Sequence, residues 1–404
     1  MSLNEAAAAM DGQLIGNDRN FKGVSTDSRT LCEGELFFAL KGENFDGHDM
    51  CEHAQYAGAA AIVVARRLSV DMPQILVSDT RASLGRLASF WRDKHQLKVV
   101  GVTGSNGKTT VKGMVAAILG RLGPVLATEG NFNNEIGLPK TLFKLGAEHE
   151  FAVLEMGANH QGEIARLAAL GKPDVAIVTL CAPAHLEGFG SIEGVAKAKG
   201  EIFSSLSDDG VAIINADDDY YDYWCGVAGS RDTISFGLNN ESADVCAAEV
   251  RSNGIGAGMS FLLKLKDQEA EARIPHDGIH NVMNALAAAA ACLAVGCTLE
   301  EIVSGLSQSD VVSGRLNIHQ IDASTRVIDD TYNANPTSLI AAARVAVESG
   351  DEVWVVLGNM GELGPESNRL HAQCGDELKA LNVKKLFTYG EIARSATEAF
   401  GSLD

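Results

Sequence analysis

The stretch Val99–Met114, VVGVTGSNGKTTVKGM, decides how the rest of the sequence is interpreted. An apolar strand leads into a glycine-rich turn, and a helical pattern begins near Lys108. This order is typical of a phosphate-binding loop, in which backbone N–H groups and a helix N-terminus face one anion. The common form of the loop, GxxxxGK[ST], would place a glycine where this sequence has Val102. The first loop glycine is instead Gly104, and the motif is GxxGKT, ending at Thr109.

The loop supplies suitable groups for a nucleotide phosphate. The Lys108 ammonium would reach the β- and γ-phosphates, and the Thr109 hydroxyl would coordinate Mg²⁺, with Thr110 as a second candidate. An ordinary βα turn with an incidental lysine is the alternative, but strand, turn and helix follow one another in the required order. We therefore predict a nucleotide-binding loop made of Gly104, Ser105, Asn106, Gly107, Lys108, Thr109 and Thr110.

The 404-residue chain is strongly acidic and long enough for two or three domains. It carries 53 acidic against 33 basic side chains, a formal net charge of -20, which argues against general nucleic-acid binding. The first residues lack a signal-peptide pattern, and no run reaches the roughly 20 apolar residues that a membrane span needs. The eight cysteines form no CxxC pair, so we expect reduced thiols and a cytoplasmic location.

Three blocks of strand and helix patterns predict an α/β protein of three domains. The first block, residues 1–95, is a small α/β domain. In the second, residues 96–313, apolar strands alternate with helices, which predicts a central parallel sheet covered on both faces. The third, residues 314–404, is a smaller α/β unit whose sheet we expect to be incomplete.

Further candidate side chains follow the predicted strands of the central domain. Glu155 ends the strand EFAVLEMG and His185 follows PDVAIVTL, at the sheet edge where open α/β sheets bind ligands. Taken singly, Glu155 would more often be a capping or surface acid, and His185 a structural or solvated residue. Lys197 and Lys199 lie on the next helix, where solvated lysines are the ordinary expectation. A buried, neutral lysine could instead add CO₂ and become an anionic metal ligand.

Motifs along most of the chain resemble those of the Mur ligases of bacterial cell-wall synthesis. They are TGSNGKTT, LEMGANHQGEI, AHLEGFGS…AKAKGEIF, HNVMNALAAAA and DDTYNANPTS, and the resemblance extends from about Thr26 to Gly364. The loop of that family is GxxGK[ST], so Val102 is an ordinary strand residue. The resemblance implies a first domain that binds the UDP end of a precursor, a P-loop-type ATPase middle domain and a Rossmann-like third domain that closes over both substrates.

The resemblance also implies an ATP-dependent ligase of peptidoglycan precursor synthesis. The segments DSRTLCEGELFFALKGENFDGHD, GNFNNEIGLP and DDTYNANP are most similar to members that join D-alanyl-D-alanine to UDP-N-acetylmuramoyl-tripeptide through an acyl phosphate. ATP and Mg²⁺ would be the cofactors. The motifs leave open whether the third tripeptide residue is lysine or diaminopimelate, and they specify no oligomeric state.

The family pattern implies a metal and catalytic role for several residues. Lys108 and Thr109 would hold the phosphates and the first Mg²⁺, with Glu155 near the metals. His185 and Lys199 correspond to the second Mg²⁺ site. Lys199 would be the carbamylated position, because the family spacing Kxx[IL][FY] matches KGEIF.

Other roles concern the two large substrates. On ATP, Asn281 would lie beside the adenine, Arg315 would reach the γ-phosphate from the hinge and Asp330 would bind the ribose. On the UDP substrate, Ser28 and Arg29 would line the uridine site. Asn134 corresponds to the substrate-side asparagine of the middle domain.

Two features of the sequence depart from the family pattern. Asn359 stands in LGNM where many members have LGDM, and the last C-terminal strands and a late KGSR-like segment are not found.

The sequence also leaves three alternative interpretations of the function. A diaminopimelate-adding Mur ligase would show DNP[RA] rather than NANPTS, and a folylpolyglutamate-type ligase would lack DSR…FDGHD. The third alternative is a nucleotide-binding module that is inactive through C-terminal truncation.

Overall fold

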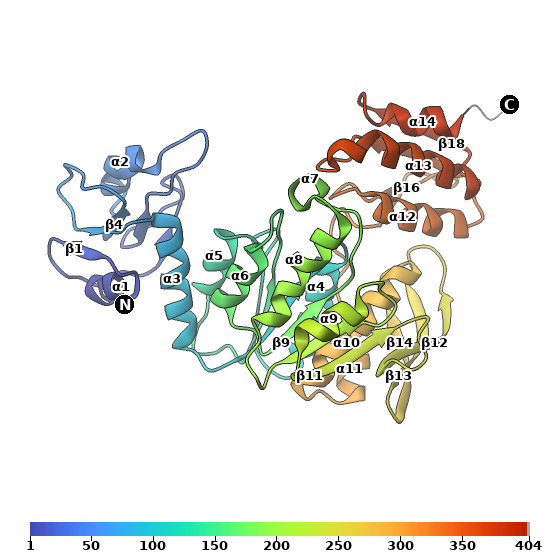
Figure 1. The fold of residues 1–404 in the computed structure, drawn as a ribbon, viewed down its shortest axis with the longest axis horizontal. Helices are drawn as coiled ribbons and strands as arrows, with labels where there is room; N and C mark the ends of the chain where they lie inside the picture. Colours follow the sequence, from blue (N-terminus) through green and yellow to red (C-terminus); the bar gives the residue numbers. More distant parts are fainter. Residues whose placement is uncertain (402–404) are drawn as a thin grey trace. The chain divides into compact units, whose positions relative to one another are not determined.

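The computed structural model describes residues 1–401, which form two compact units (Figure 1). The first unit contains residues 1–97, 128–149 and 169–171, and the second contains residues 98–127, 150–168 and the described chain from Lys172 onward. The segment around Asn134 therefore packs with the N-terminal part of the chain. The second unit includes both the central and the third sequence blocks.

A five-stranded sheet forms the first unit. Its elements are α1 (Leu3–Ala9), β1 (Gln13–Ile15), β2 (Val24–Ser25), β3 (Leu36–Phe38), η1 (Gly47–Met50), α2 (Cys51–Tyr56), β4 (Ala61–Val64), β5 (Gln74–Leu76), α3 (Thr80–Asp93) and α5 (Gly137–Leu142). The strand order is β1-β5-β4-β3-β2, and β1 alone runs antiparallel to its neighbour. Along β3, Leu36 and Phe38 join one apolar cluster while Phe37 joins another. Apolar residues on both faces are typical of a parallel sheet that is covered on both sides.

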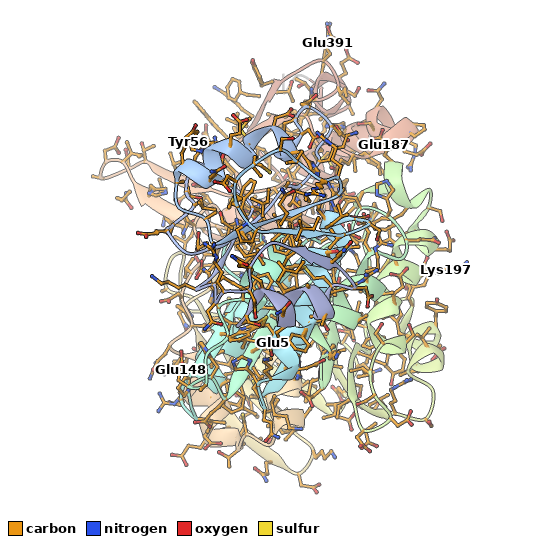
Figure 2. All side chains as sticks on the ribbon, turned by 90° about the vertical axis from the view of Figure 1, so that its left-hand side faces the viewer. Glu5, Tyr56, Glu148, Glu187, Lys197 and Glu391 are labelled. Atoms are coloured by element: carbon orange, nitrogen blue, oxygen red, sulfur yellow. The ribbon has the colours of Figure 1, made fainter. Side chains whose placement is uncertain are left out.

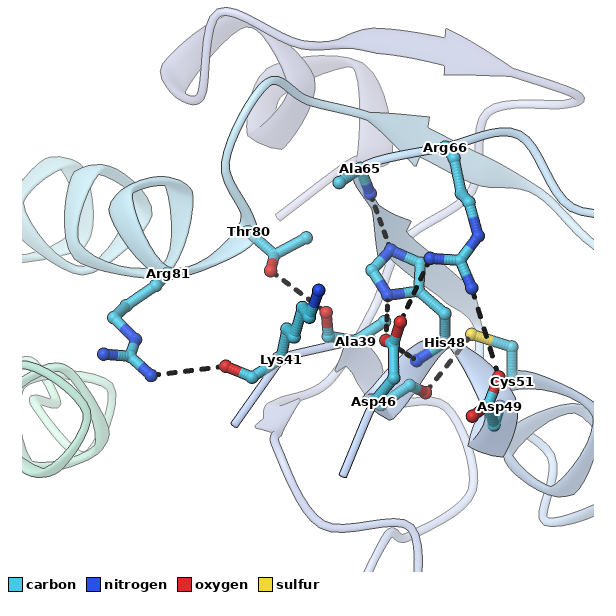
Figure 3. Close-up of polar contacts among 11 residues, drawn as sticks. Ala39, Lys41, Asp46, His48, Asp49, Cys51, Ala65, Arg66, Thr80 and Arg81 are labelled. Carbon is cyan, nitrogen blue, oxygen red and sulfur yellow. Dashed lines mark hydrogen bonds and ion pairs between the residues drawn. The ribbon is translucent and has the colours of Figure 1, made fainter. Parts of the chain in front are cut away.

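His48 anchors the turn-rich segment KGENFDGHD of this unit (Figure 3). Its Nε2 accepts the Ala65 N–H at 2.9 Å, so Nδ1 carries the proton and donates to Asp46 Oδ1 at 2.5 Å. Asp46 also accepts the His48 backbone N–H and a bond from the Arg66 guanidinium. Together these donors hold the pKa of Asp46 well below its usual range, and the backbone N–H of His48 has the largest effect.

A nine-stranded sheet forms the core of the second unit. Its strands are β6 (Lys98–Thr103), β7 (Val125–Ala127), β8 (Phe151–Glu155), β9 (Val175–Val178), β10 (Val211–Asn215), β11 (Asp232–Gly237), β12 (Val245–Ser252), β13 (Met259–Leu265) and β14 (Gln268–Ile274). The order is β14-β13-β12-β11-β10-β9-β6-β8-β7, parallel from β7 to β12 and antiparallel beyond. Because β6 lies between β8 and β9, the loop after β6 lies at the point where the strand order reverses, which is where such sheets bind ligands.

Helices cover both faces of this sheet (Figure 1). They are α4 (Lys108–Leu119), α6 (Glu163–Gly171), α7 (Leu186–Phe189), α8 (Ile192–Ser204), α9 (Tyr221–Ala228), α10 (Ile279–Val295) and α11 (Leu299–Leu306). Residues of α4, α10 and α11 form one apolar cluster with Val100 and Val102 of β6. Gly101, between them, faces Ile202 of α8 on the other side. The alternation along β6 therefore assigns α4 and α8 to opposite faces.

The third sequence block forms a smaller α/β part of the second unit. It contains β15 (Asn317–Gln320), β16 (Arg326–Asp329), α12 (Pro336–Glu348), β17 (Trp354–Gly358), η2 (Gly364–Glu366), α13 (Ser367–Ala380), β18 (Lys385–Tyr389) and α14 (Arg394–Phe400). β15 and β16 form an antiparallel hairpin, whereas β17 and β18 pair in parallel around α13. Asn359, the departure from LGDM, accepts the Ala393 N–H at 2.9 Å through Oδ1, a bond that an aspartate could also make.

Candidate active site

The glycine-rich loop joins β6 to α4, as the sequence predicts. Val102 is fully buried in β6 and pairs with Glu155 and Ile177, so position 102 is a strand residue. Gly104 and Gly107 have φ values of +141° and +81°, and a Cβ there would lie 1.9 Å from Thr179 Oγ1 and 2.3 Å from Asn284 Oδ1. Both positions therefore require glycine. The GxxGKT segment therefore forms a turn between β6 and α4 whose conformation depends on both glycines.

Side chains from the next strand connection hold the loop in place. Thr179 Oγ1 donates to the Asn106 carbonyl at 2.6 Å, and Ser105 Oγ donates to the Ala182 carbonyl at 3.1 Å. The Ser105 N–H also donates to the Leu180 carbonyl. Thr179 was not among the predicted residues, although its place directly after β9 is the signal that could have identified it. These bonds hold the loop backbone in one conformation before any ligand binds.

Lys108 lies at the first position of α4 and folds back over the loop. Its Nζ donates to the Gly104 and Ser105 carbonyls at 2.8 and 3.2 Å. Burial lowers the pKa of Lys108, while the nearby Glu155 carboxylate opposes the shift. The ammonium therefore lies at the loop, where a phosphate chain would need a cation.

Glu155 lies at the carboxyl end of β8, next to the loop strand. It is 2% exposed, and its Oε2 lies 3.5 Å from Nζ of Lys112, which is itself buried. Thr109 and Thr110 are also buried at the start of α4. Neither Lys112 nor this ion pair was predicted from the sequence.

His185 and Lys199 approach the same edge from the segment after β9. His185 has a φ of +53°, and its Nδ1 pairs with the Glu362 carboxylate of the third block. Burial lowers the pKa of His185, while Glu362 opposes that shift. The Phe189 ring lies near both His185 and Lys199: its centroid is 6.4 Å from the imidazole centroid and 5.3 Å from Lys199 Nζ.

The two lysines of α8 have different environments. Lys199 is 1% exposed, and burial, followed by the charge of Lys108, lowers its pKa to about 7. Lys197 is exposed and points outward (Figure 2). A substantial fraction of Lys199 is thus a neutral amine at neutral pH, and only the neutral amine adds CO₂. Of the two lysines, Lys199 is the one whose surroundings suit carbamylation.

The third block also contacts the loop directly. An Arg315 guanidinium N–H donates to Thr109 Oγ1 at 3.0 Å, and the guanidinium carbon Cζ lies 4.5 Å from the Tyr332 ring centroid. The side-chain amides of Asn106 and Asn335 exchange two hydrogen bonds, of 3.2 and 2.6 Å. Arg315 thus contacts Thr109 at the end of the loop, while its predicted role at the γ-phosphate stays a prediction. The Asn106–Asn335 pair was not predicted.

Three family models match most of the chain. They are the Mur ligase family catalytic domain over residues 20–92, the Mur ligase middle domain over 102–292 and the Mur ligase glutamate ligase domain over 314–401. The UDP-N-acetylmuramoyl-tripeptide--D-alanyl-D-alanine ligase of Escherichia coli (strain K12) is 43% identical over 401 residues, which is 99% of this chain and 88% of that protein. The chain belongs to the Mur ligase family. The resemblance and the three-domain α/β fold class predicted from the sequence are confirmed.

Solved structures agree with this assignment. A crystal structure titled MurF from Acinetobacter baumannii has a TM-score of 0.93 and 39% identity, and covers 98% of this chain and 87% of that chain. The structure of MurF ligase from Thermotoga maritima in complex with ADP has a TM-score of 0.83 and 28% sequence identity. The match covers 93% of this chain and 86% of that chain. The similarity therefore extends over all three blocks of this Mur ligase.

The remaining nucleotide candidates of the Mur ligase lie near the loop. Asn281 Nδ2 donates to the Asp277 carbonyl, and its Oδ1 accepts from Asn284, the residue that contacts Gly107. Asp330 Oδ1 accepts the Leu316 N–H at 3.1 Å, and burial raises the pKa of Asp330. Asn284 was not predicted, although its i, i+3 spacing from Asn281 on α10 is a signal for side-chain contact.

The three substrate candidates lie in the first unit. Arg29 donates two side-chain bonds to Asp27, at 2.9 and 2.7 Å, and its own side chain is 84% exposed. Ser28 is half-buried between them. Asn134 Oδ1 accepts the N–H groups of Ile136 and Gly137 and so orders the start of α5.

The donor set fits a magnesium ion that is shared with a nucleotide. Among residues 1–401, no three His, Cys, Asp or Glu side chains cluster as a metal site. Mg²⁺ usually takes one or two carboxylates and completes its shell with water and substrate phosphates, which Glu155 and Thr109 beside the loop would allow. A carbamate on Lys199 would add a further oxygen ligand, whereas His185 is a less usual partner for Mg²⁺.

Among residues 1–401, no helix has the length and apolar character needed to cross a membrane.

Proposed function

We propose that this Mur ligase joins D-alanyl-D-alanine to UDP-N-acetylmuramoyl-tripeptide and converts ATP to ADP and phosphate. The observation that carries the proposal is the 43% identity, over 99% of the chain, to an enzyme named for this reaction. The ADP complex of the Thermotoga maritima relative supports ATP as the nucleotide. A fully formed phosphate loop with Lys108 and Arg315 at its rim agrees with both.

The chemistry requires an activated carboxylate, because an amide does not form from a carboxylate and an amine in water unaided. A carboxylate oxygen of the tripeptide attacks the γ-phosphorus of ATP, the bond to the ADP oxygen breaks, and an acyl phosphate results. The amine of D-alanyl-D-alanine then attacks the acyl carbon, and phosphate leaves with the bonding electrons while the amine nitrogen loses a proton. Positioning and charge neutralisation carry such a transfer.

Residues of the loop edge would provide that positioning. Lys108 and the backbone of Gly104, Ser105, Asn106, Gly107, Thr109 and Thr110 would bind the phosphates. Arg315 would add cationic charge from the third block, and its approach would exclude water before the acyl phosphate forms. Mg²⁺, held by Thr109 and Glu155 and at a second site by His185 and carbamylated Lys199, would neutralise phosphate charge.

The other assignments follow the same division of the chain. Asn281 would lie beside the adenine and Asp330 would bind the ribose. Ser28 and Arg29 would bind the uridine end, and Asn134 would contact the substrate. We take residues 1–95 as the UDP-substrate domain, 96–313 as the ATP-binding domain and 314–404 as the closing domain.

A phosphate-release assay tests the proposal directly. The protein is supplied with ATP, Mg²⁺ and UDP-N-acetylmuramoyl-tripeptide, with and without D-alanyl-D-alanine, and products are followed by mass spectrometry. We expect phosphate and the pentapeptide product in equal amounts only when both substrates are present, with lysine- and diaminopimelate-containing tripeptides compared side by side. ATP binding without phosphate release under all these conditions would reject ligase activity.

A further inference from the structure

Lys112 is a buried cation that the proposed reaction does not use. It lies on α4 one turn after Lys108, and its side chain is 9% exposed. Its Nζ is 3.5 Å from Oε2 of Glu155, whose side chain is 2% exposed. Removing one partner of such a pair leaves the other charge in a dry environment, which is strongly unfavourable. The ion pair is therefore an integral part of the folded sheet edge.

The two lysines of α4 contact different groups. The Lys108 ammonium donates to the loop carbonyls of Gly104 and Ser105, so it is held over the phosphate position. Lys112, four residues later on the same helix face, lies against the carboxylate at the end of β8. A divalent cation bound at Glu155 would therefore share that carboxylate with the Lys112 ammonium.

We propose that Lys112 is a positioning residue that serves as the built-in counter-charge of Glu155 and shares this carboxylate with the bound cation. The inference rests on the metal role of Glu155 in the proposed function. In the metal-free protein Lys112 stabilises the ionised carboxylate at the strand end. When a cation binds, the ammonium repels it, and the repulsion is appreciable because both charges are shielded from water. Lys112 thereby keeps cation binding weak enough to be reversible.

Manganese binding in the presence of ADP tests this proposal without measuring catalysis. Lys112→Met removes the buried charge at nearly constant side-chain length, and Lys197→Met is the matched control on an exposed lysine. By electron paramagnetic resonance we expect Lys112→Met to bind Mn²⁺ at least about threefold more tightly than the unsubstituted protein, because a repulsive charge is gone. Lys197→Met should bind Mn²⁺ with unchanged affinity. Unchanged or weaker binding by folded Lys112→Met overturns the proposal.

Thermal unfolding provides a second measurement and covers the case in which Lys112→Met does not fold. Without divalent cations, the Tm of Lys112→Met should fall by roughly 5 °C or more, and Mn²⁺ should raise it further than it raises the Tm of the unsubstituted protein. Adding Glu155→Gln should recover part of the lost Tm, because neither charge then remains unpaired. A double variant as unstable as Lys112→Met overturns the proposal. Neither measurement uses the peptide substrates, so a wrong substrate assignment would leave both results interpretable.

Discussion

Two groups of charged side chains, one in each unit of the molecule, lie in opposite environments. At the sheet edge of the second unit, Lys112, Glu155 and Lys199 are almost fully buried. In the first unit, Asp27 and Arg29 form a surface pair with side chains 33% and 84% exposed. Burying a charge is costly, whereas an exposed pair costs little and contributes little to stability. The proposed function assigns the buried set to the chemistry and the exposed pair to binding of a ligand, and the predictions below test this contrast.

Lys108→Ala should give the largest effect of the substitutions considered. The contrast between the two units would fail if this variant impaired ligand binding by both of them. We expect ATP turnover to fall by about 10³-fold, because the variant lacks the cation that we propose stabilises charge on the transferring phosphoryl group. Binding of UDP-N-acetylmuramoyl-tripeptide, measured by calorimetry, should stay within about twofold, since its uridine candidates lie in the first unit. Lys197→Ala serves as the control. Loss of substrate binding in folded Lys108→Ala would show that the roles assigned to the two units are wrong.

Lys199→Ala should have the next largest effect and sharpens the contrast between buried and exposed lysines on α8. We expect ligation to fall by about 10²-fold because the variant cannot form the proposed anionic carbamate, and short carboxylates or bicarbonate should restore part of the activity. Lys197→Ala, on the exposed side of the helix, should keep near-normal activity. Near-normal activity in Lys199→Ala would contradict the carbamate assignment.

The pKa of Lys199 gives that assignment a pH dependence. Burial holds the pKa at about 7, so the amine is mostly protonated below pH 7 and mostly neutral above it. Carbamate formation consumes the neutral amine and releases a proton, so its occupancy should rise as pH increases through 7. Carbon-13 NMR with labelled bicarbonate measures the occupancy. The signal should be missing from Lys199→Ala and retained in Lys197→Ala.

The amide pair between Asn106 and Asn335 should have a moderate effect. Its two hydrogen bonds connect the phosphate loop to Asn335, the N-cap residue of α12, so losing them should loosen the contact between the third block and the loop. We expect Asn335→Ala to weaken ADP binding about fivefold, which corresponds to about 1 kcal/mol. Asn106→Ala should do the same, and the double variant should be little worse than either single one. Fully additive losses in calorimetric titrations would mean that the two amides act independently.

Sequence reasoning located the parts of the site that depend on local order. The strand, the glycines and the start of α4 follow one another within a few residues, so the loop and Lys108 could be predicted. The residues that fix the loop come from far along the chain: Thr179 is 73 residues from Asn106, and Asn335 is 229 residues away. Only the folded sheet brings them together, and no local pattern specifies such contacts.

The fold shows the same division between local and distant information. The strands β6, β8 and β9 were predicted because each is a continuous apolar run, which is typical of a parallel sheet buried on both faces. The antiparallel strands β12–β14 were not predicted. β12 and β14 are half-exposed, with polar residues such as Arg251 and Glu271 on their outer faces, so their apolar signal is weaker. β13 is largely buried, and its apolar run MSFLLKL was missed. The choice of Lys199 over Lys197 came from family spacing and stays a prediction; the structure adds that Lys199 is buried and Lys197 is exposed.

Asp46→Asn should give the smallest effect and tests the first unit alone. Asp46 accepts bonds from the His48 ring, the His48 backbone and Arg66, so its ionised form is favoured in the folded state. Because its folded pKa is lowered, this stabilisation is complete well above the ordinary carboxyl value of about 4 and is lost as pH falls toward the folded pKa. At pH 7 we expect Asp46→Asn to lower Tm by about 2–4 °C, and the gap should narrow toward pH 3. Asp49→Asn, at a neighbouring exposed acid 4.0 Å from Arg66, should show a smaller gap at every pH. The asparagine amide can still accept the backbone N–H but carries no charge to lose. A difference in Tm between Asp46→Asn and the unsubstituted protein that stays constant from pH 7 to pH 3 would therefore contradict the prediction. It would mean that side-chain shape rather than charge holds the KGENFDGHD segment.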